Sequence, residues 1–226
     1  VHVVVKYDGA KIKDQYYSVK GYCDAVIKAG KYDAGLVELC KATLDYGRYA
    51  QEAFNYKADS LVNGGTDVSD WASVTVPDYG ADKEDGSELV TGVTLSLVTT
   101  SKTQLVARFR TTAASPDGFS ATVDGVDVTP GLALENGKIK VAVTGIAAKD
   151  LDAKKAIVLT DPKGGTYTFE VSPVDYMGLA VSKSSQVDLN RAFYNYHLKA
   201  KAYQGPGAVL TRALSASGLT AAAPAL

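Results

Sequence analysis

The sequence predicts an α+β protein: an Ig-like antiparallel β-sandwich inserted between two helical hairpins that pack together, preceded by an N-terminal β-hairpin. Three observations lead to this prediction. Apolar residues recur at helical spacing near both ends of the chain. Between residues 66 and 172, apolar and polar residues alternate instead, as they do in strands. The helical segments of the two ends also match each other position by position, which indicates an internal repeat.

Composition excludes some classes of protein. The chain has 226 residues, of which 46% are hydrophobic and 22% are charged, values typical of a globular protein. The 24 Lys and Arg residues against 25 Asp and Glu residues give no basic field, so we expect no nucleic-acid partner. No run of 18 apolar residues occurs, so we expect no membrane insertion. The chain starts at Val1 inside an alternating run, which favours a piece of a larger polypeptide.

The first 65 residues divide into a hairpin of strands and a hairpin of helices. Residues 1–18 alternate on both sides of the turn at Asp8-Gly9, which predicts a β-hairpin. Residues 19–65 are expected to form the first helical hairpin, with helices over 19–29 and 33–56.

A second helical hairpin is predicted over residues 173–205, with helices over 174–183 and 187–203. At an offset of 150 residues Tyr46 matches Tyr196, and Ser18 matches Ser172 at an offset of 154. Because neither hairpin can bury its apolar stripe alone, we expect the two to pack together. The Ala-rich residues 206–226 read as a tail or linker.

Residues 66–172 are expected to form the β-sandwich. Seven strands are predicted, over residues 72–76, 89–99, 104–112, 119–123, 138–144, 156–160 and 166–171. Turn sequences such as Asp124-Gly125 and Asn136-Gly137 separate them. Seven short antiparallel strands with one apolar face are typical of an Ig-like fold, although the Cys…Trp…Cys core of antibody domains is missing.

Cys23 and Cys40 lie on the apolar stripes of the first two predicted helices, at similar height if these helices form an antiparallel hairpin. Two interpretations stay open: a pair of buried thiols, or a disulfide, which an exported protein would permit. A catalytic thiol is disfavoured, because nothing nearby in the sequence would predictably lower its pKa. No further Cys or His stands at zinc-binding spacing, so no metal site is predicted.

A search for catalytic chemistry finds no site. His2 and His197 are interpreted as surface or rim residues, and no hydrolase, zinc-protease or nucleotide-binding motif occurs. The acidic residues 82–88 lack the spacing of an EF-hand and are interpreted as a solvated loop. We therefore predict no catalytic residue, no metal and no cofactor, and we do not expect an enzyme.

Two aromatic residues are the candidate ligand contacts. Trp71 is the only Trp and lies where the helices give way to the predicted sandwich. Half-exposed Trp and Tyr side chains anchor interfaces and stack on sugars, but a core or interdomain position is the favoured interpretation of Trp71. Tyr79, between Asp78 and Gly80, is expected to be exposed.

Several of these segments also carry a family resemblance. They are Tyr17-Ser18-Val19-Lys20-Gly21-Tyr22, Leu36-Val37, Lys41-Ala42, Tyr46-Gly47, Ala50-Gln51, Phe54, Tyr56, Gly145-Ile146-Ala147-Ala148-Lys149-Asp150-Leu151, and Leu189 with Arg191-Ala192-Phe193-Tyr194-Asn195-Tyr196. Over residues 11–205 the chain resembles a helix/β-sandwich/helix module of secreted and cell-surface multidomain proteins of Gram-positive gut bacteria. Cys40 and Thr43 depart from it, because the family often has large aliphatic residues there. The resemblance implies an extracellular location, secreted or associated with the cell wall, and it provides no catalytic residues that could be carried over to this chain.

Three functions are compatible with these observations. The leading hypothesis is a non-catalytic binding or adhesion module that contacts a host or cell-wall protein or glycan. A structural spacer module is the second hypothesis. A carbohydrate-binding module or a fragment of a carbohydrate-active enzyme is the third, and it depends on Trp71 and the acidic loops alone.

Overall fold

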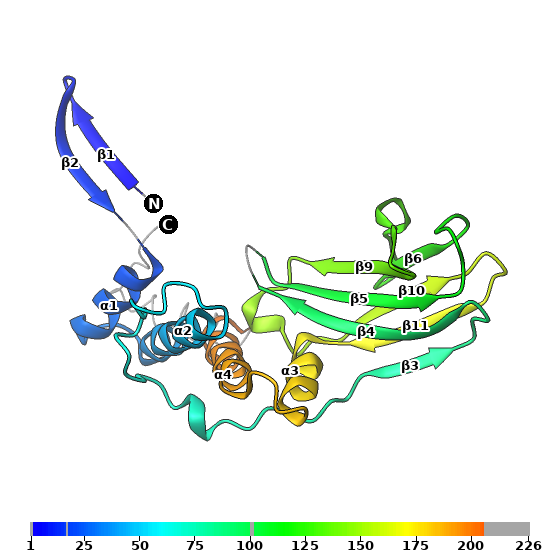
Figure 1. Ribbon diagram of the computed structural model, residues 1–226. Coiled ribbons are helices and arrows are strands. Elements are labelled where there is room, and N and C mark those ends of the chain that lie inside the picture. Colours follow the sequence, from blue (N-terminus) through cyan, green and yellow to red (C-terminus); the bar gives the residue numbers. More distant parts are fainter. Residues whose placement is uncertain (1, 17, 100–101, 206–226) are drawn as a thin grey trace. The chain divides into compact units, whose positions relative to one another are not determined.

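The structure is a computed structural model, and it describes residues 2–16, 18–99 and 102–205. It is α+β as predicted, with four α-helices and three antiparallel sheets in the described residues (Figure 1). The chain divides into two units. Unit 1 comprises Val1–Val74 and Asp188–Leu226, and unit 2 is the continuous segment Thr75–Val187.

Unit 1 contains a two-stranded sheet and three helices. Strands β1 (His2–Tyr7) and β2 (Ala10–Tyr16) form the predicted hairpin, with Tyr7 paired to Ala10 across the turn. Helices α1 (Val19–Ala29) and α2 (Ala34–Ala53) follow, then a short 3-10 helix, η1 (Trp71–Ser73). Helix α4 (Val187–Gln204) returns to this unit from the far end of the chain.

The bounds of α1 and α2 follow from their caps. The side chain of Ser18 accepts a hydrogen bond from the backbone N–H of Gly21, and α1 ends at Gly30 in the left-handed conformation. Asp33 caps α2 in the same way, accepting from the N–H of Leu36. Cys23, Val26, Leu36, Cys40 and Leu44 form the buried cluster between the two helices.

Helix α4 packs on α2 through stacked aromatic rings, and the two ribbons lie beside each other in Figure 1. The Tyr46 ring stacks on Phe193 with centroids 4.5 Å apart and on Tyr196 with centroids 5.6 Å apart. Tyr46 and Tyr196 are the two residues that the internal repeat matches, so equivalent positions of the repeat meet face to face.

Unit 2 contains two sheets. The five-stranded sheet has the order β3 (Asp82–Asp85), β11 (Thr166–Val171), β10 (Lys155–Thr160), β6 (Ser120–Val123), β7 (Val126–Asp127). The four-stranded sheet has the order β4 (Val90–Val98), β5 (Gln104–Thr111), β9 (Lys138–Thr144), β8 (Leu134–Glu135). Between β6 and β7 the turn Asp124-Gly125 has positive φ at both residues, as its sequence predicts.

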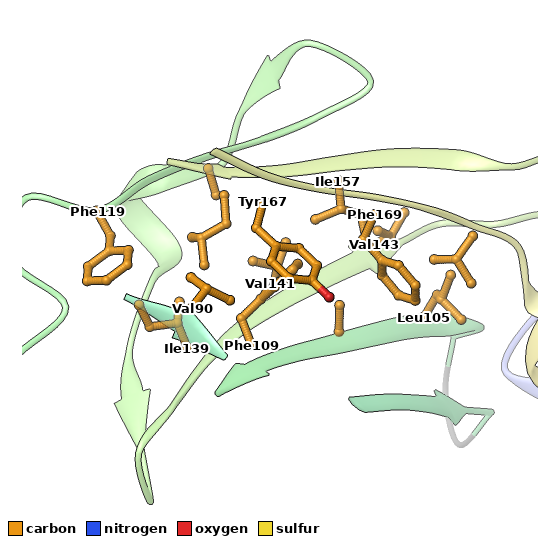
Figure 2. Packing of buried hydrophobic residues seen from close by; sticks show 14 residues of the cluster. Val90, Leu105, Phe109, Phe119, Ile139, Val141, Val143, Ile157, Tyr167 and Phe169 are labelled. Atoms are coloured by element: carbon orange, nitrogen blue, oxygen red, sulfur yellow. The ribbon is translucent and has the colours of Figure 1, made fainter. Parts of the chain in front are cut away.

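One apolar cluster of 14 buried residues draws on both sheets (Figure 2). The alternating residues Leu105, Ala107 and Phe109 enter it from β5, and Tyr167, Phe169 and Val171 enter it from β11. The rings of Phe109 and Tyr167, one from each sheet, meet edge to face with centroids 5.6 Å apart. The alternation in the sequence therefore marks the buried face of these strands correctly.

Helix α3 (Pro173–Ser182) belongs to unit 2, with the strands, whereas α4 belongs to unit 1. A capping box starts α3: Ser172 Oγ accepts from the N–H of Asp175, and Asp175 Oδ2 accepts from the N–H of Ser172. Asp175 Oδ1 also accepts from the N–H of Gly80, which ties the chain before β3 to α3. At Gly178 a Cβ atom would clash with the carbonyl oxygen of Pro77, so only glycine allows this approach.

The first predicted strand is wrong. Residues 72–76 form no strand; η1 (Trp71–Ser73) and irregular backbone occupy this place. The first strand of unit 2 is instead β3, inside the acidic stretch that we interpreted as a loop. All four side chains of β3 are exposed, and the strand is held by backbone pairing to β11, so no apolar alternation marks it. The short strands β7 and β8 were not predicted either, and residues 206–226 lie outside the described residues.

Candidate functional site

Unit 1 has a groove between α1, α2 and α4, with a volume of about 190 Å³. It is lined by Val19, Tyr22, Cys23, Leu36, Leu39, Cys40, Thr43, Tyr196, Ala200 and Gln204. Most of these residues are aliphatic or aromatic, and none of them is Asp, Glu, Lys, Arg or His. The groove is therefore an apolar surface, and we call it the three-helix groove.

Two exposed residues of α1 stand at the three-helix groove. The side chain of Val19 is 67% exposed and that of Tyr22 is 44% exposed. They lie one turn apart on the same face of α1, so both can contact one bound side chain. Apolar side chains left in water beside an apolar groove are the usual marks of an interaction site.

The wall of the groove opposite α1 is fixed by the aromatic stack. Tyr196 stacks on Tyr46, and Phe193 stacks on Tyr46 one helical turn earlier in α4. Burial raises the pKa of Tyr196, so its hydroxyl stays neutral across the physiological range. Ala200, one turn further along α4, has only a methyl group, which leaves space for the groove.

Cys23 and Cys40 lie at the buried side of the groove, and each is 3% exposed. Their side chains are hydrogen-bonded to each other. This hydrogen bond, together with burial, raises the pKa of Cys23, while the same bond lowers the pKa of Cys40 against the effect of burial. Both cysteines are free thiols in the structure.

The segment that follows α2 is fastened by two polar side chains of that helix. Asp45 is completely buried and accepts hydrogen bonds from Asn63 Nδ2 at 2.9 Å, from the N–H of Val68, and from the N–H and hydroxyl of Ser69 at 2.7 and 2.6 Å. Gln51 donates to the carbonyls of Lys57 and Ser60 and accepts from the N–H of Val62. Loop residues 57–69 therefore take a fixed course along α2.

Trp71, the first candidate ligand contact, is an interior residue of unit 1. Its side chain is 7% exposed, and the Tyr49 ring lies edge-on to it at a centroid distance of 4.5 Å. The indole Nε1 has no hydrogen-bond partner among the residues that the structure describes. An indole buried this far offers no ring face for a sugar, so Trp71 is not among the residues on which we base the function.

Tyr79, the second candidate, belongs to unit 2 and is 42% exposed. Its backbone is held against α3 by the contact at Gly178 and by the hydrogen bond from Gly80 to Asp175. Burial of part of the ring, and the nearby Asp175 carboxylate, raise the pKa of Tyr79. It is a single exposed ring on rigid backbone.

The remaining candidates provide no second site. His197 is buried beside the Tyr194 ring, so the rim position that we expected for it is wrong. The side chain of His2 is outside the described residues. Across residues 2–16, 18–99 and 102–205, no group of three or more His, Cys, Asp or Glu side chains could hold a metal ion. In the same ranges no helix has both the length and the apolar character needed to span a membrane.

Sequence reasoning did not find the three-helix groove. The contributions of Tyr196 and Ala200 depend on α4 meeting a helix 150 residues earlier, which periodicity alone does not specify. One signal was present: Val19 and Tyr22 extend the apolar stripe of α1 beyond what its short interface with α2 buries. No protein-family model, no curated protein sequence and no solved structure matches the chain.

Proposed function

We propose that this chain is a non-catalytic binding module that holds a protein partner through the three-helix groove. The observation that carries the proposal is an apolar groove with two exposed apolar residues, Val19 and Tyr22, on one face of α1. At about 190 Å³ the groove is smaller than the roughly 300–1,000 Å³ of typical small-molecule pockets. Its size suits one apolar or aromatic anchor side chain of a partner protein.

The wider setting is part of the same proposal. We assign unit 2 to the Ig-like β-sandwiches: lettered A, B, C, C′, D, E, F and G in chain order, β4 to β11 give the sheets A-B-E-D and G-F-C-C′. This strand order, and a core drawn from both sheets, support the assignment. Adhesion in a secreted or cell-wall-associated bacterial protein, with a host or cell-wall partner, is supported by the family resemblance.

The test uses a matched pair of substitutions. Val19 and Val126 are exposed to nearly the same degree, 67% and 66%, but Val126 lies on β7 in unit 2. A phage-displayed peptide library is panned on the wild-type protein, and the selected peptides are measured on the variants. We expect Val19→Asp to weaken binding at least tenfold, because it places a charge at the apolar groove, and Val126→Asp to leave it unchanged.

Other outcomes favour the competing functions. Peptides that bind Val19→Asp and wild type equally would contradict the groove as the contact surface. A glycan array run in parallel that shows binding, with loss of this binding in Tyr79→Ala, would favour a carbohydrate-binding module. An absence of binding in both assays would favour a structural spacer.

A further inference from the structure

The contact between the two thiols is built by the helical hairpin. Cys23 lies seven residues before Gly30, where α1 ends, and Cys40 lies seven residues after Asp33, where α2 is capped. Equal distances from the connection put the two side chains at the same height along the helices. Both side chains belong to the buried cluster between α1 and α2 and interact with each other, so the two thiols lie together at the helix–helix contact.

The two cysteines also form part of the groove wall. Both cysteines line the three-helix groove, so a small reagent that enters between Val19, Tyr22 and Tyr196 arrives at the thiol pair. The pair has a built-in asymmetry: the hydrogen bond from the Cys23 thiol stabilises a thiolate at Cys40. Cys40 is therefore the better nucleophile of the two, and Cys23 stands in position to react second.

Apart from the cysteine contact, helix α1 buries few side chains that could hold it in place. Cys23 and Val26 are its only buried residues, and α1 is described throughout. Val19 and Tyr22 face solvent at the groove. The apolar cluster that joins α1 to α2 contains five buried residues, of which two are these cysteines. A covalent link at this point would fix the helix that carries the exposed side of the groove.

We propose that Cys23 and Cys40 form a reversible disulfide, made by exchange with a small-molecule disulfide, that cross-links α1 to α2 at the buried side of the three-helix groove. The Cys40 thiolate attacks one sulfur of the small disulfide, its S–S bond breaks, and one small thiolate leaves and takes up a proton. The Cys23 thiol then loses its proton and attacks the Cys40 sulfur, which releases the second small thiol. In total the protein loses two hydrogen atoms and the small disulfide is reduced to two thiols.

The experiment equilibrates the folded protein with mixtures of glutathione and glutathione disulfide, then traps the remaining thiols in denaturant with a maleimide that adds mass. We expect both thiols to be lost together in a monomer, without attached glutathione, and to return on addition of dithiothreitol. Cys23→Ser and Cys40→Ser are the controls: each should keep one thiol or carry one glutathione, and neither should form the monomeric cross-link.

Three results would overturn the proposal. They are thiols that stay free in the folded protein at every ratio, independent glutathione attachment to each cysteine, or a cross-link between two chains. Because the wild-type protein gives the decisive result, the proposal stays testable even if a serine variant fails to fold. The measurement needs no binding partner, so a failure of the binding proposal does not affect it.

Discussion

The interiors of unit 1 and unit 2 differ in the kinds of side chain that they bury. In unit 2, 14 buried residues from both sheets form one apolar cluster. The cluster between α1 and α2 in unit 1 has five buried residues, two of them cysteines. Unit 1 also buries polar side chains along its helices, namely Asp45, Gln51, Asn190, Asn195 and His197, whereas the buried polar residues of unit 2 lie mostly at turns and at a helix cap, namely Thr111, Asp161, Ser172 and Asp175. Apolar area stabilises the sheets, whereas directed hydrogen bonds stabilise much of the helical unit.

The largest effect is expected in the core of unit 2. Phe109 is fully buried and contacts Tyr167 edge to face, so Phe109→Ala leaves a cavity between the two sheets. We expect a loss of about 3–5 kcal/mol in stability. Hydrogen exchange measured by mass spectrometry should show faster opening of peptides from β5 and β11. Protection equal to that of the wild type would mean that this core does not stabilise the sheets.

The corresponding test in unit 1 removes a hydrogen-bond acceptor. Asp45→Asn keeps the shape of the side chain but puts an amide donor among donors from Asn63, Val68 and Ser69. We expect a loss of roughly 2–3 kcal/mol, because hydrogen bonds to a buried charged group are lost. Trp71 is the only Trp in the chain and lies in unit 1, so its fluorescence in a urea titration reports this change.

The matched control for that substitution is Asp24→Asn. Asp24 is an exposed residue of α1 that pairs with Lys20 on the surface, and its loss should cost less than about 0.5 kcal/mol. If Asp45→Asn is as mild as this control, the polar description of unit 1 is wrong.

A smaller effect is expected at two serine caps, one in each unit. Ser172 starts α3 in a buried capping box, and Ser18 starts α1 with an exposed hydrogen bond to the N–H of Gly21. Replacing the cap by alanine should cost about 1–2 kcal/mol at Ser172 and about 0.5–1 kcal/mol at Ser18. Urea titrations followed by circular dichroism measure both, and the reverse order would show that burial of the cap is not what matters.

The smallest effect is a dependence on pH in unit 2. Asp161 accepts hydrogen bonds from the Ser87 hydroxyl at 2.6 Å and from the N–H groups of Lys163 and Gly165, which lower its pKa from the ordinary 3.8. A lowered pKa in the folded state stabilises the protein above pH 3.8, and this contribution disappears as the pH falls through the lowered value.

The stability difference between wild type and Asp161→Asn should therefore be constant above about pH 5 and shrink towards zero in acid. Urea titrations at several pH values measure it. Asp117→Asn, at an exposed residue, is the control and should show no such trend. A difference that persists unchanged into acid would contradict the assignment to the charge of Asp161.

The sequence predicts those strands and helices whose spacing of apolar residues follows from which of their residues are buried. The alternation of Leu105, Ala107 and Phe109 marks a strand because every second residue is buried. Strand β3 has no buried side chain, so its charged sequence shows no apolar alternation. His197 was misplaced for a related reason: polar residues of α4 are buried by hydrogen bonding, and an apolar stripe does not show this.

The candidate site was harder to predict than the fold. Contact between the two cysteines follows from their equal distance to the helix connection, which can be read from sequence. The three-helix groove cannot, because its third wall comes from α4, and the repeat does not say which faces meet. Trp71 illustrates the same limit, since its burial depends on the course of a loop that Asp45 and Gln51 fix.

Unit 1 is assembled from the two ends of the chain, and this has a consequence for its synthesis on the ribosome. Helix α2 is made before the whole of unit 2, whereas Phe193 and Tyr196, which stack on its Tyr46, are among the last residues of the described chain. The continuous unit 2 can fold while α4 is still being translated, because synthesis at roughly 5–20 residues per second is slow beside folding. Until α4 is complete, the nascent chain therefore has Tyr46 on α2 without the two rings that stack on it. During that time Tyr46 is available to chaperones.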